Sequence, residues 1–162
     1  MPHDDAADRT ERALQLAHSY LDRRERTTSE VRGYLLSKGF DAATTERTLA
    51  ALSEDGMLDD DRFARLFTAD KRELERWGAE RIRRDLLQRG VEPETVAAAL
   101  VDGAETSAFE MELRRALELL RRRFPSPPGD RRERDRALGV LVRKGYDVEL
   151  ALDALAAYAR GH

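Results

Sequence analysis

Apolar residues recur every three or four positions along most of this chain, which is the period of an amphipathic helix. One such stripe is Phe109, Leu113, Leu117, Leu120 and Phe124, with charged residues between its members. No segment alternates apolar and polar residues in the way a half-buried strand does, so the chain is predicted to be all-α. The predicted helices cover residues 10–25, 28–38, 42–55, 59–76, 79–89, 93–102, 105–124, 130–144 and 147–159.

Three of these helices end in the same segment: two apolar residues, a polar residue, a cation, a glycine and an apolar residue. The glycines are Gly39, Gly90 and Gly145, which lie about 51 and 55 residues apart. Glycine readily takes the left-handed conformation that ends a helix, and the preceding cation favours the negative end of the helix dipole. Such an ending pairs the residue after the glycine with the one five positions earlier. The predicted pairs are Phe40 with Leu35, Val91 with Leu86 and Tyr146 with Leu141.

Helix starts are marked as clearly as helix ends. Thr27 and Glu30 have the spacing of a capping box. If Asp59 caps the fourth helix, Leu58 and Phe63 take the positions of a hydrophobic staple. Pro93 suits a first helical turn. The last helix has a capping residue available in Asp147.

The repeated endings predict three tandem three-helix repeats, over residues 10–57, 58–103 and 104–162, after a flexible tail at residues 1–9. A proline-rich segment at 125–129 is predicted to form a stiff bend inside the third repeat, with a domain boundary as the alternative. Because units of fewer than about 60 residues are marginally stable alone, each repeat should lean on its neighbours. An elongated, curved array of repeats is therefore expected.

Composition argues for a binding protein without a cofactor. Of the 162 residues, 38% are charged and 6% aromatic, which suits thin helical packing rather than one thick core. There is no cysteine, and the histidines are scattered at positions 3, 18 and 162, so no metal site is predicted. No phosphate loop, nucleophile elbow or metal-protease motif is present, which argues against an enzyme. The consecutive acids at 59–61 fit helix capping better than metal binding.

Membrane insertion and secretion are not expected. The longest apolar run, residues 96–101, is far shorter than the roughly 18 residues that a spanning helix needs. The acidic N-terminus has no apolar core of the kind found in a secretion signal. A cytoplasmic protein is expected.

The net charge of −3 excludes a bulk excess of basic residues, so any nucleic-acid contact must be local. Arginine dominates the local basic clusters, and its forked guanidinium suits phosphate or carboxylate recognition. The alternatives are a solvated, ion-paired surface and a bias from GC-rich coding. The residues predicted to make contacts are Arg81, Arg83, Arg84, Arg89, Arg121, Arg122, Arg123 and Lys144. Trp77, the only tryptophan, is interpreted as a packing residue at a junction between repeats, with base stacking as the less favoured alternative.

Three stretches of the chain resemble the RecX family of bacterial regulatory proteins. Leu58-Asp59-Asp60-Asp61-Arg62-Phe63-Ala64 is similar to the family's Leu-Asp-Asp-x-Arg-Phe-Ala signature. The segment from Trp77 and Gly78 through Arg81, Ile82 and Leu86 to Gly90 is similar to its aromatic-Gly-Pro-x-Arg-Ile-x-x-Glu-Leu segment and closing Lys/Arg-Gly. Residues 24–35 resemble its first-repeat pattern. Two departures are Ala79, where proline is common, and Tyr34, where a basic residue is frequent.

The resemblance implies a helical array that lies in the groove of RecA–DNA filaments and inhibits or destabilises them, without catalytic activity of its own. It thus implies RecA as the protein partner, single-stranded DNA within the filament as a second contact, and a role in DNA repair and the SOS response. A monomer is expected. Within the motif, it supports contact roles directly only for Arg81 and for the position of Arg89.

Two other classes of function compete with this one. A helix-turn-helix DNA reader would share the short helix, glycine turn and following helix, but the helices after the turns open with acidic or small residues, as at Asp41, Glu92 and Asp147. A helical scaffold that binds only protein is the second alternative. Salt titration of binding to single-stranded DNA separates them, because phosphate contacts weaken steeply with salt.

Overall fold

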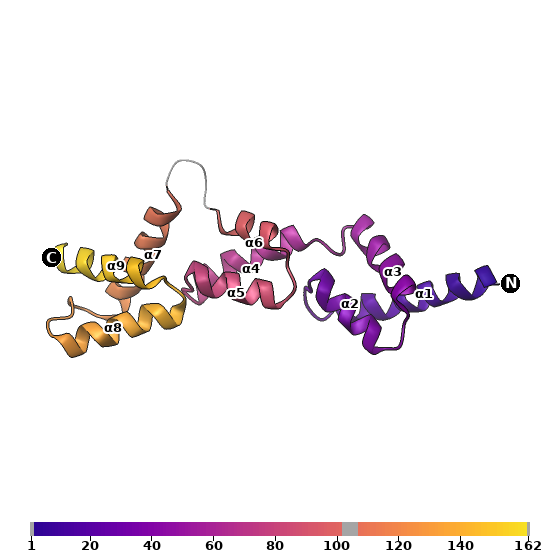
Figure 1. The fold of residues 1–162 in the computed structure, drawn as a ribbon, viewed down its shortest axis with the longest axis horizontal. Helices are drawn as coiled ribbons and strands as arrows, with labels where there is room; N and C mark the ends of the chain where they lie inside the picture. The colour runs from indigo at the N-terminus through magenta and orange to yellow at the C-terminus, as the bar shows by residue number, and fades with distance from the viewer. Residues whose placement is uncertain (1, 102–106, 162) are drawn as a thin grey trace. The chain divides into compact units, whose positions relative to one another are not determined.

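All regular structure in the described part of the chain is helical. The computed structural model describes residues 2–101 and 107–161, and within these ranges it contains nine α-helices and no strand (Figure 1). The predicted all-α class and its three-helix repeats are therefore confirmed. The helices are α1 (Pro2–Leu21), α2 (Thr28–Ser37), α3 (Ala42–Glu54), α4 (Asp60–Leu74), α5 (Ala79–Gln88), α6 (Pro93–Leu100), α7 (Ala108–Arg123), α8 (Arg131–Lys144) and α9 (Val148–Arg160).

The predicted and observed helices differ most at the two ends of α1. It begins at Pro2, so residues 2–9 form helical turns where a flexible tail was predicted, and it ends at Leu21 rather than near residue 25. Arg9 pairs with Asp5 one turn earlier at 2.7 Å and lies 3.7 Å from Asp41 at the start of α3. These i,i+4 and cross-helix pairs favour helix in the segment. The predicted boundary between the second and third repeats, at 103–104, lies outside the described residues.

The chain divides into two compact units, which cut across the three sequence repeats. The first unit comprises residues 2–65 with Leu86–Val96, and the second comprises Leu66–Asp85 with the residues from Ala97 onward. Helices α1, α2 and α3 pack on one another in the first unit, and α7, α8 and α9 do so in the second. The middle repeat contributes residues to both units, among them the buried Ile82 of the second unit and the buried Leu86 and Val96 of the first.

Each unit has its own apolar core. In the first unit the core includes Val31, Leu35, Leu49 and Leu52, all at most 4% exposed. In the second unit α7, α8 and α9 bury a larger set, of which Leu120, Leu141 and Ala154 are fully buried. Most of the predicted α7 stripe packs here, but Phe109 at its start is half exposed.

The three glycine endings form as predicted. Gly39, Gly90 and Gly145 have φ angles of +90°, +80° and +97°. In each ending the glycine N–H donates to the carbonyl three residues earlier, and the next N–H donates to the carbonyl five residues earlier. This double hydrogen bond defines the Schellman ending. Thus Phe40, Val91 and Tyr146 each return to the leucine predicted for them.

The predicted helix starts are also confirmed. Thr27 and Glu30 form a complete capping box, and Asp147 accepts hydrogen bonds from the amides of the first turn of α9. Asp59 accepts from the Arg62 amide at 2.9 Å, with both staple residues, Leu58 and Phe63, buried. Of the helices described, none is both long and apolar enough to cross a bilayer.

Candidate functional site

In the second unit, the N-terminus of α5 meets the C-terminus of α8 end to end. The Gly78 amide donates to the carbonyl of Lys144 at 2.8 Å, and the Glu80 amide donates to the carbonyl of Gly145 at 3.1 Å. A helix leaves its first amides and its last carbonyls without partners inside the helix. Each helix end therefore satisfies the other, and the two helix dipoles align head to tail. This arrangement is called the α5–α8 joint below.

Two glycines make the close approach at the α5–α8 joint possible. A Cβ added to Gly78 would lie 2.5 Å from the Gly145 carbonyl oxygen. A Cβ added to Gly145 would lie 2.3 Å from the Cβ of Arg81 and 2.7 Å from its backbone nitrogen. Gly39 has the same place in the first repeat, yet a Cβ there would meet nothing within 4 Å. The same glycine ending is thus a plain helix stop in one repeat and part of a joint in another.

Glu112, on α7, completes the joint. Its carboxylate accepts a 2.7 Å hydrogen bond from the Ala79 amide, the first amide of α5. Glu112 is only 8% exposed, and its other oxygen lies 3.4 Å from Arg115 and 3.9 Å from Arg72. Sequence reasoning missed this residue, because a single glutamate in a charged helix carries no local sign that it caps a distant helix.

Glu112→Ala is expected to lower the free energy of unfolding of the second unit by about 3 kcal/mol. The change leaves the Ala79 amide without its acceptor and removes the carboxylate beside two largely buried arginines. Glu112→Gln, which keeps an oxygen acceptor, should cost less. Urea unfolding followed by circular dichroism measures both, and equal stability of the wild type and Glu112→Ala would contradict the capping role.

Trp77, interpreted from the sequence as a packing residue, lies beside the α5–α8 joint. It is 8% exposed, with the Arg81 guanidinium 3.9 Å and the Lys71 ammonium 4.7 Å from its ring centre. The Tyr146 hydroxyl donates to the carbonyl of Arg76 at 3.2 Å. Burial, aided by the charge of Glu112, raises the pKa of Tyr146, so this hydroxyl remains a neutral donor at physiological pH.

The first unit contains a second joint of the same design, between the N-terminus of α2 and the end of α5. The Thr27 hydroxyl donates to the Arg89 carbonyl at 2.7 Å, and Asp60 of α4 accepts from the first α2 amide, that of Thr28, at 2.8 Å. A Cβ on Gly90 would lie 2.3 Å from the Ser29 side chain. Asp60 therefore plays the part here that Glu112 plays in the second unit.

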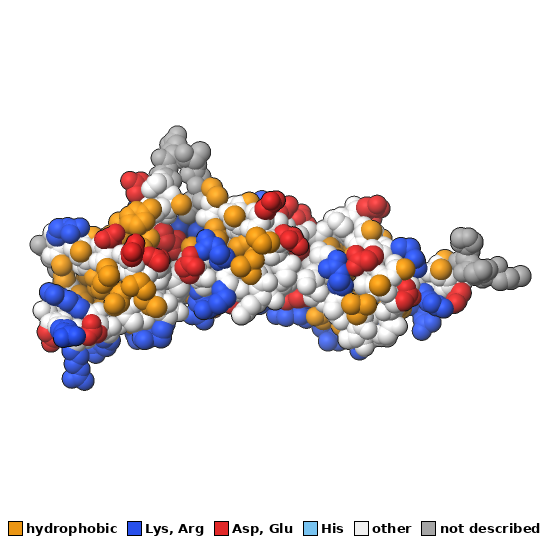
Figure 2. Space-filling model, in the orientation of Figure 1, with side chains coloured by type: hydrophobic (Ala, Val, Ile, Leu, Met, Phe, Trp, Pro, Cys, Tyr) orange, Lys and Arg blue, Asp and Glu red, His pale blue; other side chains and the backbone are white. Residues whose placement is uncertain are grey.

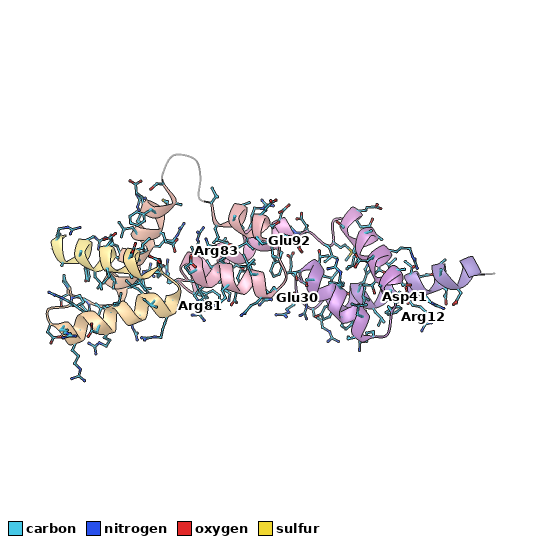
Figure 3. The ribbon with its side chains drawn as sticks, viewed as in Figure 1. Arg12, Glu30, Asp41, Arg81, Arg83 and Glu92 are labelled. Atoms are coloured by element: carbon cyan, nitrogen blue, oxygen red, sulfur yellow. The ribbon has the colours of Figure 1, made fainter. Side chains whose placement is uncertain are left out.

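A basic hollow opens beside the α5–α8 joint. It measures about 460 Å³ and is lined by four cations, Arg81, Arg123, Arg143 and Lys144, with Leu119 and Val140. Arg81 donates to the Arg143 carbonyl and Lys144 to the Glu75 carbonyl, at 3.2 and 2.7 Å. Within the described residues none of the four cations forms an ion pair with a carboxylate, so their positive charges are not neutralised. Figure 3 labels Arg81 at the end of α5 that approaches α8.

The structure thus brings together three of the eight predicted contact residues: Arg81, Arg123 and Lys144. Arg143 was not predicted, although its position next to Lys144 in the repeated helix ending could have indicated it. Four cations that line one concave surface suit a phosphate or another anion.

The other five predicted contact residues do not line this hollow. Arg83 pairs with Glu80, and Arg122 with Glu118 at 3.1 Å. Arg84 and Arg121 are exposed. Arg89 belongs to the first unit, where its guanidinium lies 3.0 Å from Glu30.

The chain matches two family models along its first hundred residues. Residues 13–52 match the first three-helix domain of RecX, and residues 59–100 match the second. A regulatory protein RecX from Mycobacterium sp. (strain JLS) is 32% identical over 147 residues, covering 86% of this chain and 79% of the relative. The chain belongs to the RecX family.

Further RecX proteins are similar to this chain in sequence or in fold. The regulatory protein RecX of Halorhodospira halophila is 36% identical over 138 residues, covering 85% of this chain and 82% of its own length. The crystal structure of RecX from Lactobacillus salivarius superposes with a TM-score of 0.79 over 96% of this chain and 99% of that one, at 17% identity. Another RecX crystal structure gives a TM-score of 0.73 at 21% identity, covering 98% of this chain and 74% of that one.

The RecX signature residues of this chain have structural roles. Leu58, Phe63, Ile82 and Leu86 are buried, and Asp59 caps α4. Arg62 donates to the Gly56 carbonyl at 3.0 Å. The remaining members, Asp60, Trp77, Gly78 and Gly90, lie in or beside the two joints. The signature of the second repeat therefore describes how neighbouring repeats join.

Proposed function

We propose that this chain binds the filament that RecA forms on DNA and inhibits its recombinase and ATPase activities. It would act in the cytoplasm as a monomer, in homologous recombination, DNA repair and the SOS response. Membership of the RecX family supports a regulatory role, and RecA is the partner that the family resemblance implies. No catalytic step is part of the proposal.

The observation that carries the proposal is the basic hollow beside the α5–α8 joint. Four cations face one concavity, and two of them, Arg123 and Arg143, are exposed side chains. Arginine binds a phosphate through paired N–H groups, and the apolar Leu119 and Val140 can contact the sugar beside it. The hollow therefore suits the DNA backbone of a filament, while the net charge of −3 limits affinity for free DNA.

Adding the protein to RecA and single-stranded DNA tests the function directly. We expect DNA-dependent ATP hydrolysis and strand exchange to fall as the protein is titrated from substoichiometric amounts to excess. Unchanged rates of both reactions throughout that range would contradict the proposal.

Salt titrations of binding to single-stranded DNA alone and to the RecA filament separate the competing classes. Affinity for free DNA equal to that for the filament would favour a sequence-independent DNA-binding protein. Filament binding that does not change with salt would favour a scaffold that contacts only protein.

A further inference from the structure

An apolar groove runs between α8 and α9 in the second unit. Its volume is about 710 Å³, and its floor is formed by Leu138, Leu152, Leu155, Ala156 and Ala159. Helix α7 packs against both α8 and α9, but no α7 residue lines the groove. Figure 2 shows hydrophobic side chains gathered over α8 and α9, with basic side chains beside them. Leu152 is half exposed, so the groove leaves apolar surface in contact with water.

The first repeat has charged residues at the positions that correspond to the groove leucines. Arg32 lies seven residues before Gly39, and Glu46 lies seven residues after it. Their side chains form an ion pair at 2.7 Å between α2 and α3. The hydrogen bond from Arg32 lowers the pKa of Glu46. At the corresponding positions in the third repeat, Leu138 lies seven residues before Gly145 and Leu152 seven residues after it. The third repeat thus has two leucines where the first has a solvated ion pair, an exposure that is unfavourable unless something covers it.

The rim of the groove carries positive charge. Helix α8 has 14 residues, against 10 in both α2 and α5, and its first half bears Arg131, Arg132, Arg134 and Arg136. Arg131 and Arg134 line the groove with Asp135, which lies 4.0 Å from Arg131. Glu133, the other acid in this stretch, accepts a hydrogen bond from the Gly129 amide. An occupant with an apolar stripe and acidic flanks would complement both the floor and the rim.

We propose that this groove binds an amphipathic helix with acidic flanking residues, presented by the protein component of the RecA filament. The inference rests on the proposed function. It adds which surface of this chain contacts the filament protein and which kind of element that surface binds. Two antiparallel helices with an apolar seam accept a third through side chains at i, i+3 or i+4 and i+7. The protein contact would then be distinct from the basic hollow, which serves phosphates.

Two matched substitutions on one helix test the groove. Leu152 and Val148 both lie on α9 and are 50% and 49% exposed, but only Leu152 lines the groove. Leu152→Glu is expected to weaken binding to RecA filaments at least about tenfold, because it places a charge in an apolar contact. Val148→Glu should bind like the wild type, and circular dichroism should show both variants folded. Arg131→Glu combined with Arg134→Glu should also weaken binding about tenfold.

Crosslinking identifies what occupies the groove. Since the chain has no cysteine, Leu152→Cys provides a single thiol for a photoreactive maleimide, with Val148→Cys as the control. The inference predicts a crosslink from position 152 to a RecA segment with apolar residues at helical spacing and acidic neighbours. A crosslink to DNA or to a basic segment overturns it.

The results also separate the inference from the proposed function. Filament binding by Leu152→Glu as tight as that of the wild type overturns the groove alone and leaves the proposed function standing. Absence of wild-type binding to RecA filaments overturns both.

Discussion

Gly145→Ala is expected to lower the free energy of unfolding of the second unit by at least about 3 kcal/mol. An alanine at φ +97° is strained by about 1–2 kcal/mol on its own. Its Cβ would also lie 2.3 Å from the Cβ of Arg81 and 2.7 Å from the Arg81 backbone nitrogen, which forces α5 and α8 apart. The hydrogen bonds from Gly78 and Glu80 to the end of α8 would then be lost with the joint.

Gly39→Ala is the matched control for this prediction. Gly39 has a similar φ of +90° and ends the corresponding helix of the first repeat, but a Cβ there meets nothing within 4 Å. Its substitution should cost only the backbone strain, about 1–2 kcal/mol. Urea unfolding of both variants by circular dichroism gives the comparison. Equal losses from the two substitutions would show that the α5–α8 joint does not stabilise the unit.

Replacing Arg123 and Arg143 together with alanine is expected to weaken binding to RecA–DNA filaments about tenfold or more. Both side chains are exposed and line the basic hollow, so their loss removes two phosphate contacts while the core stays intact. The logarithmic slope of affinity against salt should become shallower by about 1.4, since each contact to single-stranded DNA contributes about 0.7.

The choice of these two arginines follows from the geometry of the joint. Arg81 and Lys144 also line the hollow, but they donate to backbone carbonyls, and Arg81 stacks on Trp77. Their removal would change stability as well as binding. The control is Arg12→Ala with Arg23→Ala, two exposed arginines of the first unit. Equal loss of affinity in both double variants would argue for a diffuse charge effect and against the hollow as the contact.

Local features of the sequence were enough to predict most helix boundaries. The partners in the glycine endings, the Thr27–Glu30 box and the Asp59 and Asp147 caps are only a few residues apart in the chain. Their spacing in the sequence is therefore enough to show which residues interact. The helical start at Pro2 was missed because part of its support is a contact with α3, through Arg9 and Asp41.

The candidate site was predicted only in part, because its members come from three helices, α5, α7 and α8. Charge clusters along the chain indicated Arg81, Arg123 and Lys144, but clustering in sequence also selected Arg83 and Arg122, which pair with acids one turn away. Arg143 and Glu112 were missed, since their roles depend on which helix ends meet.

By itself, the sequence determined the all-α class, the repeat and the points at which its helices stop, because these depend on backbone preferences and short-range hydrogen bonds. Only the tertiary structure decided which copies of the repeated ending form joints. It also decided that Glu112 and Asp60 cap helices of a neighbouring repeat, and that four cations share one hollow. Those features need residues 30 or more positions apart to meet. Their contacts are set by the packing of helix ends, which no local pattern encodes.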